Sequence, residues 1–369
     1  MTGAEYIAEF LSKIGSKKVF VVTGGACAFI IDAIARNDQL EYFPFQHEQA
    51  AAMAADSLWK IDKTVGVTVV TSGPGATNLI TGIACSYFDS IPTIHITGQV
   101  NQNEKLIYQG AIVRQAGFQE TNIVDMVKPI TKYAIQVTSV KELKEELSKA
   151  YKIALEGRMG PVLIDVPMDV QQAEAGDKVD VRDPEIESIT DLQKNEIQGT
   201  LSKFFNGGER PLVLFGAGVG LADQEDCVIR FIESNNLPFV SSWNGMNFFT
   251  HKHKNYYGNI GVYGNRGANF ILQSSDRLLV LGSRLDNRQR GNVKKFAVNA
   301  NVLVMDIDQG ELNKHKNNEN HTMIQLDFSN LHRILDNLNL NLGLNAHWYE
   351  FNTKVKDKYF THWPSSSAK

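Results

Sequence analysis

The segment VGVTVVTSGPGATN, residues 65–78, passes from an apolar run through a glycine-rich turn. The run lacks the polar alternation of a half-exposed strand, which is typical of a strand buried on both faces of a parallel sheet. Gly73 and Gly75 would let the backbone approach a ligand closely, and a helix beginning there would present free N–H groups. The turn matches neither the Walker loop nor the dinucleotide fingerprint. The simpler alternative is a tight strand-to-helix turn that binds nothing.

Short apolar strands and helical patterns alternate on both sides of this segment. In the first half we expect strands at 19–23, 41–46, 65–71, 93–97 and 162–166, and helices at 3–14, 48–59, 78–88 and 140–156. In the second half we expect strands at 211–215, 238–242, 277–281 and 302–307, and helices at 223–235 and near 267–273. The sequence therefore predicts an α/β protein with two doubly wound, mostly parallel-sheet domains.

A polar, strand-poor stretch, QQAEAGDKVDVRDPEIESI, separates the two series. Domain boundaries favour such composition. We expect one domain over 1–170, a linker over 171–189, a central Rossmann-like domain over 190–340 and a tail over 341–369.

The composition excludes several classes of protein. Of 369 residues, 43% are hydrophobic and 21% charged, and the net charge is 37 − 41 = −4. These are globular values without bulk attraction for nucleic acid or an anionic membrane. No apolar run approaches the ~20 residues that cross a bilayer, and the first residues lack a signal-peptide pattern. With three scattered cysteines, at 27, 85 and 227, the sequence predicts a cytoplasmic protein with free thiols.

Three strand ends carry residues suited to a ligand. Besides 71–78, the loop Thr23-Gly24-Gly25-Ala26 follows the first predicted strand, and Glu48 follows the second. Because the carboxyl ends of parallel strands meet at one edge of a sheet, we expect the three loops to line one crevice. By itself, Glu48 also fits a simpler role, in which it complements the dipole of its helix by about 0.3–1 kcal/mol.

Three longer strings carry a family resemblance: HEQAA at 47–51, TSGPGATNLITGIACSYFDSIPTIHITGQV at 71–100, and GFQETNIVDMVKPITKY at 117–133. They resemble the pyrimidine-binding domain of thiamine-diphosphate-dependent enzymes, and within these are most similar to acetolactate synthase (acetohydroxyacid synthase) large subunits. The resemblance extends from about Gly3 to about Phe328, over the N-terminal and central domains of that family.

The resemblance implies a catalytic role for Glu48. In the family, the matching glutamate hydrogen-bonds N1′ of the aminopyrimidine and favours the tautomer that takes the proton from the thiazolium C2. A 2-keto acid such as pyruvate is then decarboxylated, and its two-carbon unit passes to a second keto acid, as in branched-chain amino acid biosynthesis. Phe118 matches a segment that reaches toward the substrate. The matching cofactor-binding positions are Gly24, Gly25, Ala26, Pro74, Asn78 and Gln119.

Two departures from acetolactate synthase bear on the substrate. Thr23 stands where the family usually has proline, and NEKLIYQGAIVRQAG at 103–117 lacks the recognisable arginine-bearing segment. The acceptor substrate stays open. The alternatives are another 2-keto-acid decarboxylase or carboligase of the same superfamily, and a non-catalytic, degenerate nucleotide-binding protein.

The second predicted domain resembles the flavin-contacting part of the synthase. A carboxylate at a strand end can bind ribose hydroxyls, and an arginine can pair with a diphosphate. The alternative is a domain that keeps the fold without a nucleotide. The tentative flavin positions are Gly216, Gly218, Arg284, Asp286, Asp306 and Asp308. In the family this FAD is structural.

No Gly-Asp-Gly string occurs in the sequence, whereas the family binds Mg²⁺ and the cofactor diphosphate through such a motif in a third domain. We therefore expect the Mg²⁺ ligands to lie outside this chain, which would be an incomplete enzyme by itself. The resemblance further implies a homodimer or homotetramer with its active site between subunits.

Overall fold

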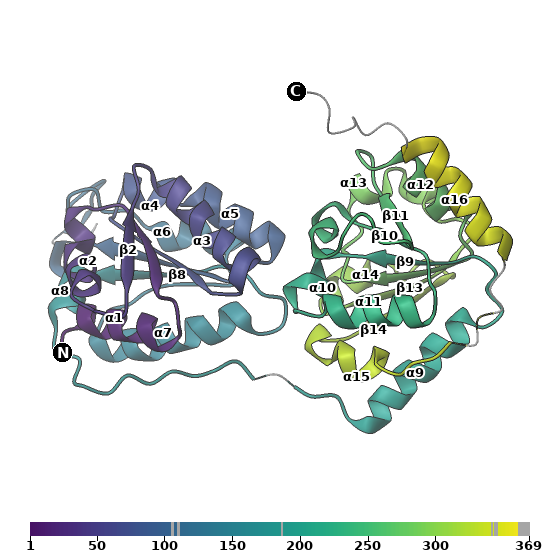
Figure 1. Ribbon diagram of the computed structural model, residues 1–369. Helices are drawn as coiled ribbons and strands as arrows, with labels where there is room; N and C mark the ends of the chain where they lie inside the picture. Colours follow the sequence, from purple (N-terminus) through teal and green to yellow (C-terminus); the bar gives the residue numbers. More distant parts are fainter. Residues whose placement is uncertain (105–106, 109–110, 186, 341, 343–345, 361–369) are drawn as a thin grey trace. The chain divides into compact units, whose positions relative to one another are not determined.

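Two six-stranded sheets organise the chain (Figure 1). The computed structural model describes residues 1–369 except 105–106, 109–110, 186, 341, 343–345 and 361–369. The first unit, Met1–Glu185, and the second unit, Ile186–Lys369, each contain one of these sheets with helices on both faces. Every strand pair in the two sheets is parallel. The prediction of two doubly wound α/β domains is confirmed.

The first sheet has the order β2-β1-β3-β4-β8-β7. After β1 the chain moves to one side to form β2 and then returns to the other side of β1 to form β3. In open α/β sheets, ligands bind beyond the carboxyl ends of the strands at such a reversal, here β1 and β3. The strands are β1 (Lys18–Val21), β2 (Glu41–Pro44), β3 (Gly66–Val70), β4 (Thr93–Gln99), β7 (Tyr133–Gln136) and β8 (Val162–Pro167). A separate antiparallel pair consists of β5 (Ile107–Tyr108) and β6 (Ala111–Ile112).

Helices cover both faces of this sheet (Figure 1). One face packs on α1 (Gly3–Lys13), α2 (Ala28–Ala35), α7 (Val140–Leu155) and α8 (Met168–Gln172), and the other on α3 (Glu48–Asp62), α4 (Pro74–Asn78), α5 (Ile80–Asp89) and α6 (Ile123–Val127). Val67 and Val69 of β3 belong to the first core, and Val70 belongs to the second. Because both faces of β3 are buried, its sequence needs no polar alternation.

The ends of some elements differ from the prediction. β1 ends at Val21 and β2 at Pro44, two residues earlier than expected, because the following residues turn away to form the edge loops. The helix expected from Asn78 begins instead at Pro74 in α4 and continues, after an irregularity at Leu79, as α5. Proline suits the first turn of a helix, where its missing N–H costs nothing.

The second sheet has the order β11-β10-β9-β12-β13-β14, with its reversal between β9 and β12. Its strands are β9 (Pro211–Phe215), β10 (Phe239–Ser241), β11 (Tyr256–Asn259), β12 (Arg277–Leu281), β13 (Asn301–Asp306) and β14 (His321–Gln325). One face packs on α9 (Asp191–Phe205), α11 (Glu225–Ser234) and α15 (Leu331–Leu335), and the other on α12 (Arg266–Ser274) and α16 (Ala346–Phe360). Short helices α10 (Ala217–Leu221), α13 (Asn287–Arg290) and α14 (Gln309–Asn313) follow strand ends.

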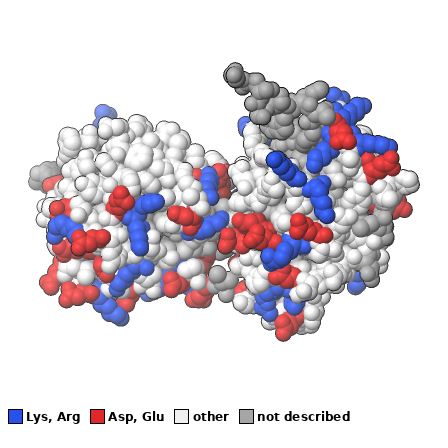
Figure 2. All heavy atoms as spheres, viewed as in Figure 1, with Lys and Arg blue, Asp and Glu red and all other residues white. Residues whose placement is uncertain are grey.

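The polar stretch after α8 packs on the first unit. Ala175 and Val179 are buried in the core that also contains α1 and α7. Acidic and basic side chains are interspersed on the face of each unit shown in Figure 2. None of the helices in the described part of the chain has the length and apolar character needed to cross a membrane.

Candidate functional site

The loops after β1 and β3 touch at the carboxyl edge of the first sheet. The backbone N–H of Ala26 donates a hydrogen bond to Oγ1 of Thr71, with an N···O distance of 3.3 Å. A Cβ placed on Gly24 would lie 2.4 Å from Cβ of Thr71, which no real contact allows. The absence of a side chain at Gly24 therefore lets the two loops meet.

Glu48 begins α3 at this edge. Its side chain is buried, with 8% of the residue exposed, and Nδ2 of Asn78 donates to its Oε2 at 2.9 Å. Its other oxygen, Oε1, makes no hydrogen bond within the described part of the chain. The carboxylate is thus fixed through one oxygen, and the second can accept or share a proton.

Close helix packing brings Asn78 to Glu48. A Cβ on Gly82 of α5 would lie 2.3 Å from Cβ of Ala52 in α3. The two helices can cross this closely because Gly82 and Ala52 are small. Asn78 and Glu48 each lie four residues before this crossing point, so the crossing also brings their side chains together.

Gly75 bounds the space beside the second oxygen. A Cβ there would lie 3.3 Å from Oε1 of Glu48 and 2.7 Å from Cγ2 of Thr71. Gly25 differs, because a Cβ on that residue would meet nothing within 4 Å. The edge is therefore closely packed at Gly24 and Gly75 and open above Gly25.

Gln119 lies against the β3 loop. It adopts the left-handed conformation with φ of 57°, which is uncommon for residues other than glycine. A Cβ on Gly73, whose φ is 63°, would lie 2.7 Å from Cβ of Gln119. Pro74 and Gln119 are exposed, as is Phe118 at 79%. Gln119 thus meets the same β3 loop that contacts Gly24, Ala26 and Glu48, whereas Phe118 is exposed.

Gln171 contributes to this edge but was not singled out from the sequence, and Thr71 was noted only as part of the 71–78 motif. Gln171, fully buried in α8, donates through Nε2 to the carbonyl oxygens of Ala26 (2.7 Å) and Val166 (2.8 Å). It supports the β1 loop from behind. The available signal was a glutamine in the short helix after a buried strand, and such glutamines are too common for the sequence to indicate what this one binds.

The second unit has a similar close approach at its reversal point. The N–H of Gly216 donates to the Leu281 carbonyl at 2.8 Å, and that of Gly218 to the Gly282 carbonyl at 2.9 Å. A Cβ on Gly216 would lie 2.2 Å from the oxygen of Gly282. The loops after β9 and β12 are therefore joined through their backbones.

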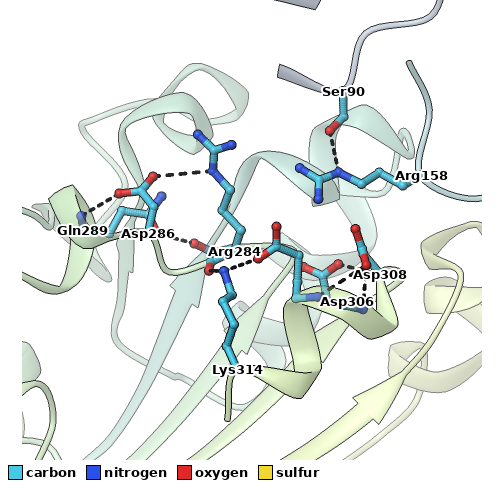
Figure 3. A network of polar contacts seen from close by, with 11 residues as sticks. Ser90, Arg158, Arg284, Asp286, Gln289, Asp306, Asp308 and Lys314 are labelled. Atoms are coloured by element: carbon cyan, nitrogen blue, oxygen red, sulfur yellow. Dashed lines mark hydrogen bonds and ion pairs between the residues drawn. The ribbon is translucent and has the colours of Figure 1, made fainter. Parts of the chain in front are cut away.

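The predicted polar residues of the second unit form short-range contacts (Figure 3). Asp286 caps α13 by accepting from the N–H groups of Arg288 and Gln289, and its Oδ2 lies 3.5 Å from Nε of Arg284. Lys314 donates to the carbonyl of Arg284 at 2.8 Å. Near the end of β13, Asp308 caps α14, and its N–H donates to Asp306. The capping contacts by themselves give Asp286 and Asp308 a structural role.

Among the residues that the structure describes, no group of three or more histidine, cysteine, aspartate or glutamate side chains could hold a metal ion.

Comparison with known protein families identifies both units. Residues 1–126 match the model described as thiamine pyrophosphate enzyme, N-terminal TPP binding domain, and residues 200–330 match the central domain of the same enzymes. The chain belongs to the thiamine pyrophosphate enzymes. Glu48 and the β3 loop lie within the N-terminal match, and the β9 and β12 loops lie within the central-domain match.

Individual relatives agree with this assignment. The chain is 33% identical to the acetolactate synthase isozyme 2 large subunit of Escherichia coli over 90% of its length. It is 33% identical to the acetolactate synthase large subunit of Lactococcus lactis over 99% and 36% identical to the probable acetolactate synthase large subunit of Methanocaldococcus jannaschii over 85%. The matches cover 58%, 62% and 52% of these relatives, so the chain spans little more than half of their length.

Proposed function

We propose that the chain supplies the pyrimidine-activating part of a thiamine-diphosphate site in an acetolactate-synthase-like transferase. The reaction is decarboxylation of a 2-keto acid, pyruvate, with transfer of the two-carbon unit to a second keto acid. The observation that carries the proposal is the pair of Glu48 and Asn78, in which one carboxylate oxygen is fixed and the other has no protein partner in the described chain.

The residues at the edge fit an aminopyrimidine. A flat ring needs backbone without side chains along one face, and Gly25 and Gly75 provide it. A ring nitrogen needs a carboxylate with an available oxygen, and Oε1 of Glu48 borders the space beside Gly75. Ala26, Pro74 and Gln119 are assigned to the remaining sides of the ring. Thiamine diphosphate, when bound, supplies an acidic thiazolium C2–H and a sink for the electrons released by decarboxylation.

The protein's own part is to hold a proton in the correct place. Glu48 shares a proton with the ring nitrogen through Oε1, while Asn78 keeps the carboxylate oriented through Oε2. The low exposure of Glu48 excludes the water that would otherwise compete for that proton. Gln171 holds the β1 loop, on which the ring would rest, by its bond to the Ala26 carbonyl.

The proposal also covers Mg²⁺, FAD, the assembly of the enzyme and its location. Mg²⁺ and the diphosphate are assigned to ligands outside this sequence, since it contains no Gly-Asp-Gly string. FAD is assigned to the β9 and β12 loops of the second unit. We also propose that the enzyme is a cytoplasmic homodimer or homotetramer acting in branched-chain amino acid biosynthesis.

The decisive experiment measures H/D exchange at the thiazolium C2 with the complete natural protein. Glu48→Gln removes the shared proton while keeping the size of the side chain, and should slow exchange about 10²–10⁴-fold. Gln49→Glu, one residue further along the partly exposed surface of α3, serves as the control and should leave exchange unchanged. Exchange that survives Glu48→Gln contradicts the proposal.

Two alternative functions are compatible with the same residues at the carboxyl edge of the first sheet. A different 2-keto-acid decarboxylase or carboligase is favoured by the departure at 103–117, where no arginine-bearing acetolactate synthase segment is recognisable. A non-catalytic nucleotide-binding protein would bind FAD but show no exchange at C2. Assays with a panel of keto acids distinguish the first alternative, and C2 exchange distinguishes the second.

A further inference from the structure

A buried polar network lies beneath the segment that carries Gln119. Its centre is Asp165 of β8, which is 1% exposed. Oδ1 accepts a hydrogen bond of 2.6 Å from Thr97, while Oδ2 accepts from the amides of Gln99 at 3.0 Å and Gln136 at 2.7 Å. A buried carboxylate is tolerated only when such donors surround it. The three neighbouring strands β4, β7 and β8 are thereby tied together at their carboxyl ends.

Gln99 connects this network to the edge. It is 3% exposed, and Nε2 donates both to Asp165 and, at 3.0 Å, to the carbonyl oxygen of Thr121. Its Oε1 accepts from the N–H of Val100 at 3.1 Å. With the oxygen turned toward Val100, the amide can only present its N–H groups to Asp165 and Thr121. The orientation of the amide is therefore fixed from both sides.

The backbone conformation of the segment 117–121 depends on hydrogen bonds of this kind. Thr121 Oγ1 donates to the carbonyl of Gln119 at 3.3 Å, and the N–H of Glu120 donates to the carbonyl of Gly117 at 3.2 Å. Gln119 itself is in the left-handed conformation, which an unsupported loop would leave because it is unfavourable for a residue with a Cβ. The contacts on either side of Gln119 must therefore keep it there.

We propose that Gln99 is a positioning residue for the reaction: held by Asp165, it fixes Thr121 and thereby keeps Gln119 against the β3 loop. This inference rests on the proposed function, because Gln119 is assigned to the cofactor side of the site there. Gln99 acts through the segment and contacts it at the Thr121 backbone. Loss of this one amide should let Gln119 leave the edge while Glu48 and Asn78 stay in place.

The test substitutes Gln99→Glu in the complete natural protein. The new carboxylate would face Oδ2 of Asp165 across the present 3.0 Å contact, so the pair would repel each other unless one is protonated. We expect hydrogen–deuterium exchange of the backbone amides of 117–122 to rise. We also expect kcat/KM for the keto acid to fall about 10²-fold near pH 8, since misplacement by about 1 Å costs this much. Activity should recover partly as the pH is lowered.

Gln102→Glu is a matched control. Gln102 also donates one amide to a carboxylate, Asp169 at 2.9 Å, and to a backbone carbonyl, that of Thr138 at 2.9 Å. Neither of these hydrogen bonds reaches the segment 117–121, so the variant should leave amide exchange there and the pH profile unchanged. Gln99→Met, which lacks both the donor and the charge, should loosen the segment without recovery at low pH, and it replaces Gln99→Glu if that variant does not fold.

The outcomes separate this inference from the proposed function. Unchanged amide exchange of 117–122 in both Gln99 variants overturns the inference, as does a loosened segment with undiminished kcat/KM. Failure of the proposed function would show in a different experiment, as C2 exchange that survives Glu48→Gln. C2 exchange retained in Gln99→Glu supports the separate roles of Glu48 and Gln119.

Discussion

Asn78 donates a hydrogen bond of 2.9 Å from Nδ2 to Oε2 of the buried Glu48. The two residues are 30 positions apart and are brought together by the crossing of α3 with α4 and α5. Oε1 consequently faces the space beside Gly75 instead of rotating freely. The orientation of the Glu48 carboxylate therefore depends on the amide of Asn78.

Replacing Asn78 by leucine should slow C2 exchange without abolishing it. A hydrogen bond to a charged group contributes about 1.5–3 kcal/mol, which corresponds to roughly 10–100-fold if it is lost in the reacting state. Thr77→Val is the control, because the Thr77 hydroxyl donates to the Pro74 carbonyl in the same turn and not to Glu48. The measurement is C2 exchange by NMR with the complete protein. Equal rates in the two variants would contradict the role given to Asn78.

Gly75→Ala should lower the stability of the fold, whereas Gly25→Ala should lower the affinity for the cofactor. The new Cβ at Gly75 would press on Thr71 at 2.7 Å, so we expect the free energy of unfolding to fall by about 1–3 kcal/mol. At Gly25 the Cβ meets no protein atom, so the free energy of unfolding should change by less than about 1 kcal/mol. The apparent affinity for thiamine diphosphate should fall there instead. Urea titrations and cofactor saturation curves measure the two effects, and a stable Gly25→Ala protein with normal cofactor affinity would argue against a ring above Gly25.

His95 makes the stability of the first unit dependent on pH. It lies fully buried in β4, where Thr68 contacts Nδ1 at 2.8 Å and Thr93 contacts Nε2 at 2.9 Å. Burial lowers its pKa to about 3, below the usual value near 6.5. The folded protein thus keeps His95 neutral while the unfolded chain takes up a proton below its own pKa. This stabilisation is complete above the unfolded pKa and is lost as the pH falls from about 6.5 toward 3.

Removing His95 should therefore flatten the pH dependence of unfolding. Between about pH 7 and pH 5 the wild-type protein should lose about 2 kcal/mol through this residue, which His95→Leu should not lose. The variant should be less stable at pH 7, because the hydroxyls of Thr68 and Thr93 lose their buried partner. His251→Gln, at an exposed histidine, should retain the wild-type slope. Urea unfolding at the two pH values gives the comparison, and parallel slopes for His95→Leu and wild type would disprove the assignment.

Arg284→Ala should reduce flavin content. If FAD binds at the β12 loop, the guanidinium of Arg284, which lies beside Asp286, would pair with its diphosphate, and such charge-assisted bonds contribute about 1.5–3 kcal/mol each. The purified natural protein should be yellow, and the variant should lose colour in proportion to its weaker binding. Lys295→Ala, at an exposed lysine further along the chain, should leave the absorbance unchanged. A colourless wild-type protein would exclude bound flavin.

The sequence predicted the central strands better than the edges of the sheets. β3, β9 and β12 are nearly completely buried and read as almost continuous apolar runs, whereas β4, which is also buried, alternates isoleucine with threonine and histidine. In the two six-stranded sheets, the strands that were not predicted are β7, β11 and β14, and each lies at the edge of its sheet. Every residue of β7 and most residues of β14 are half-buried. Neither strand therefore shows the alternation of buried and exposed residues that would distinguish it from a loop.

For the candidate site, the sequence likewise indicated which residues take part but not which contacts they make. Glu48 could be named from its place after a strand, and Asn78 and Gln119 from the family resemblance. The bond between Glu48 and Asn78, the left-handed backbone of Gln119 and the anchor at Gln99 depend on how helices cross and strands pair. A single sequence holds no signal for such long-range pairings, because each is set by the packing of segments far apart in the chain.

The pairing of β4 with β8 has a consequence for biosynthesis. Thr97 and Asp165, which join these strands, are separated by 68 residues, so the pair cannot form until the ribosome has passed β8. Until then the nascent chain carries β4, which is fully buried in the folded protein, with an open edge, a state that favours slow folding and association with other chains. Chaperone demand during translation should therefore peak while residues between β4 and β8 are being added.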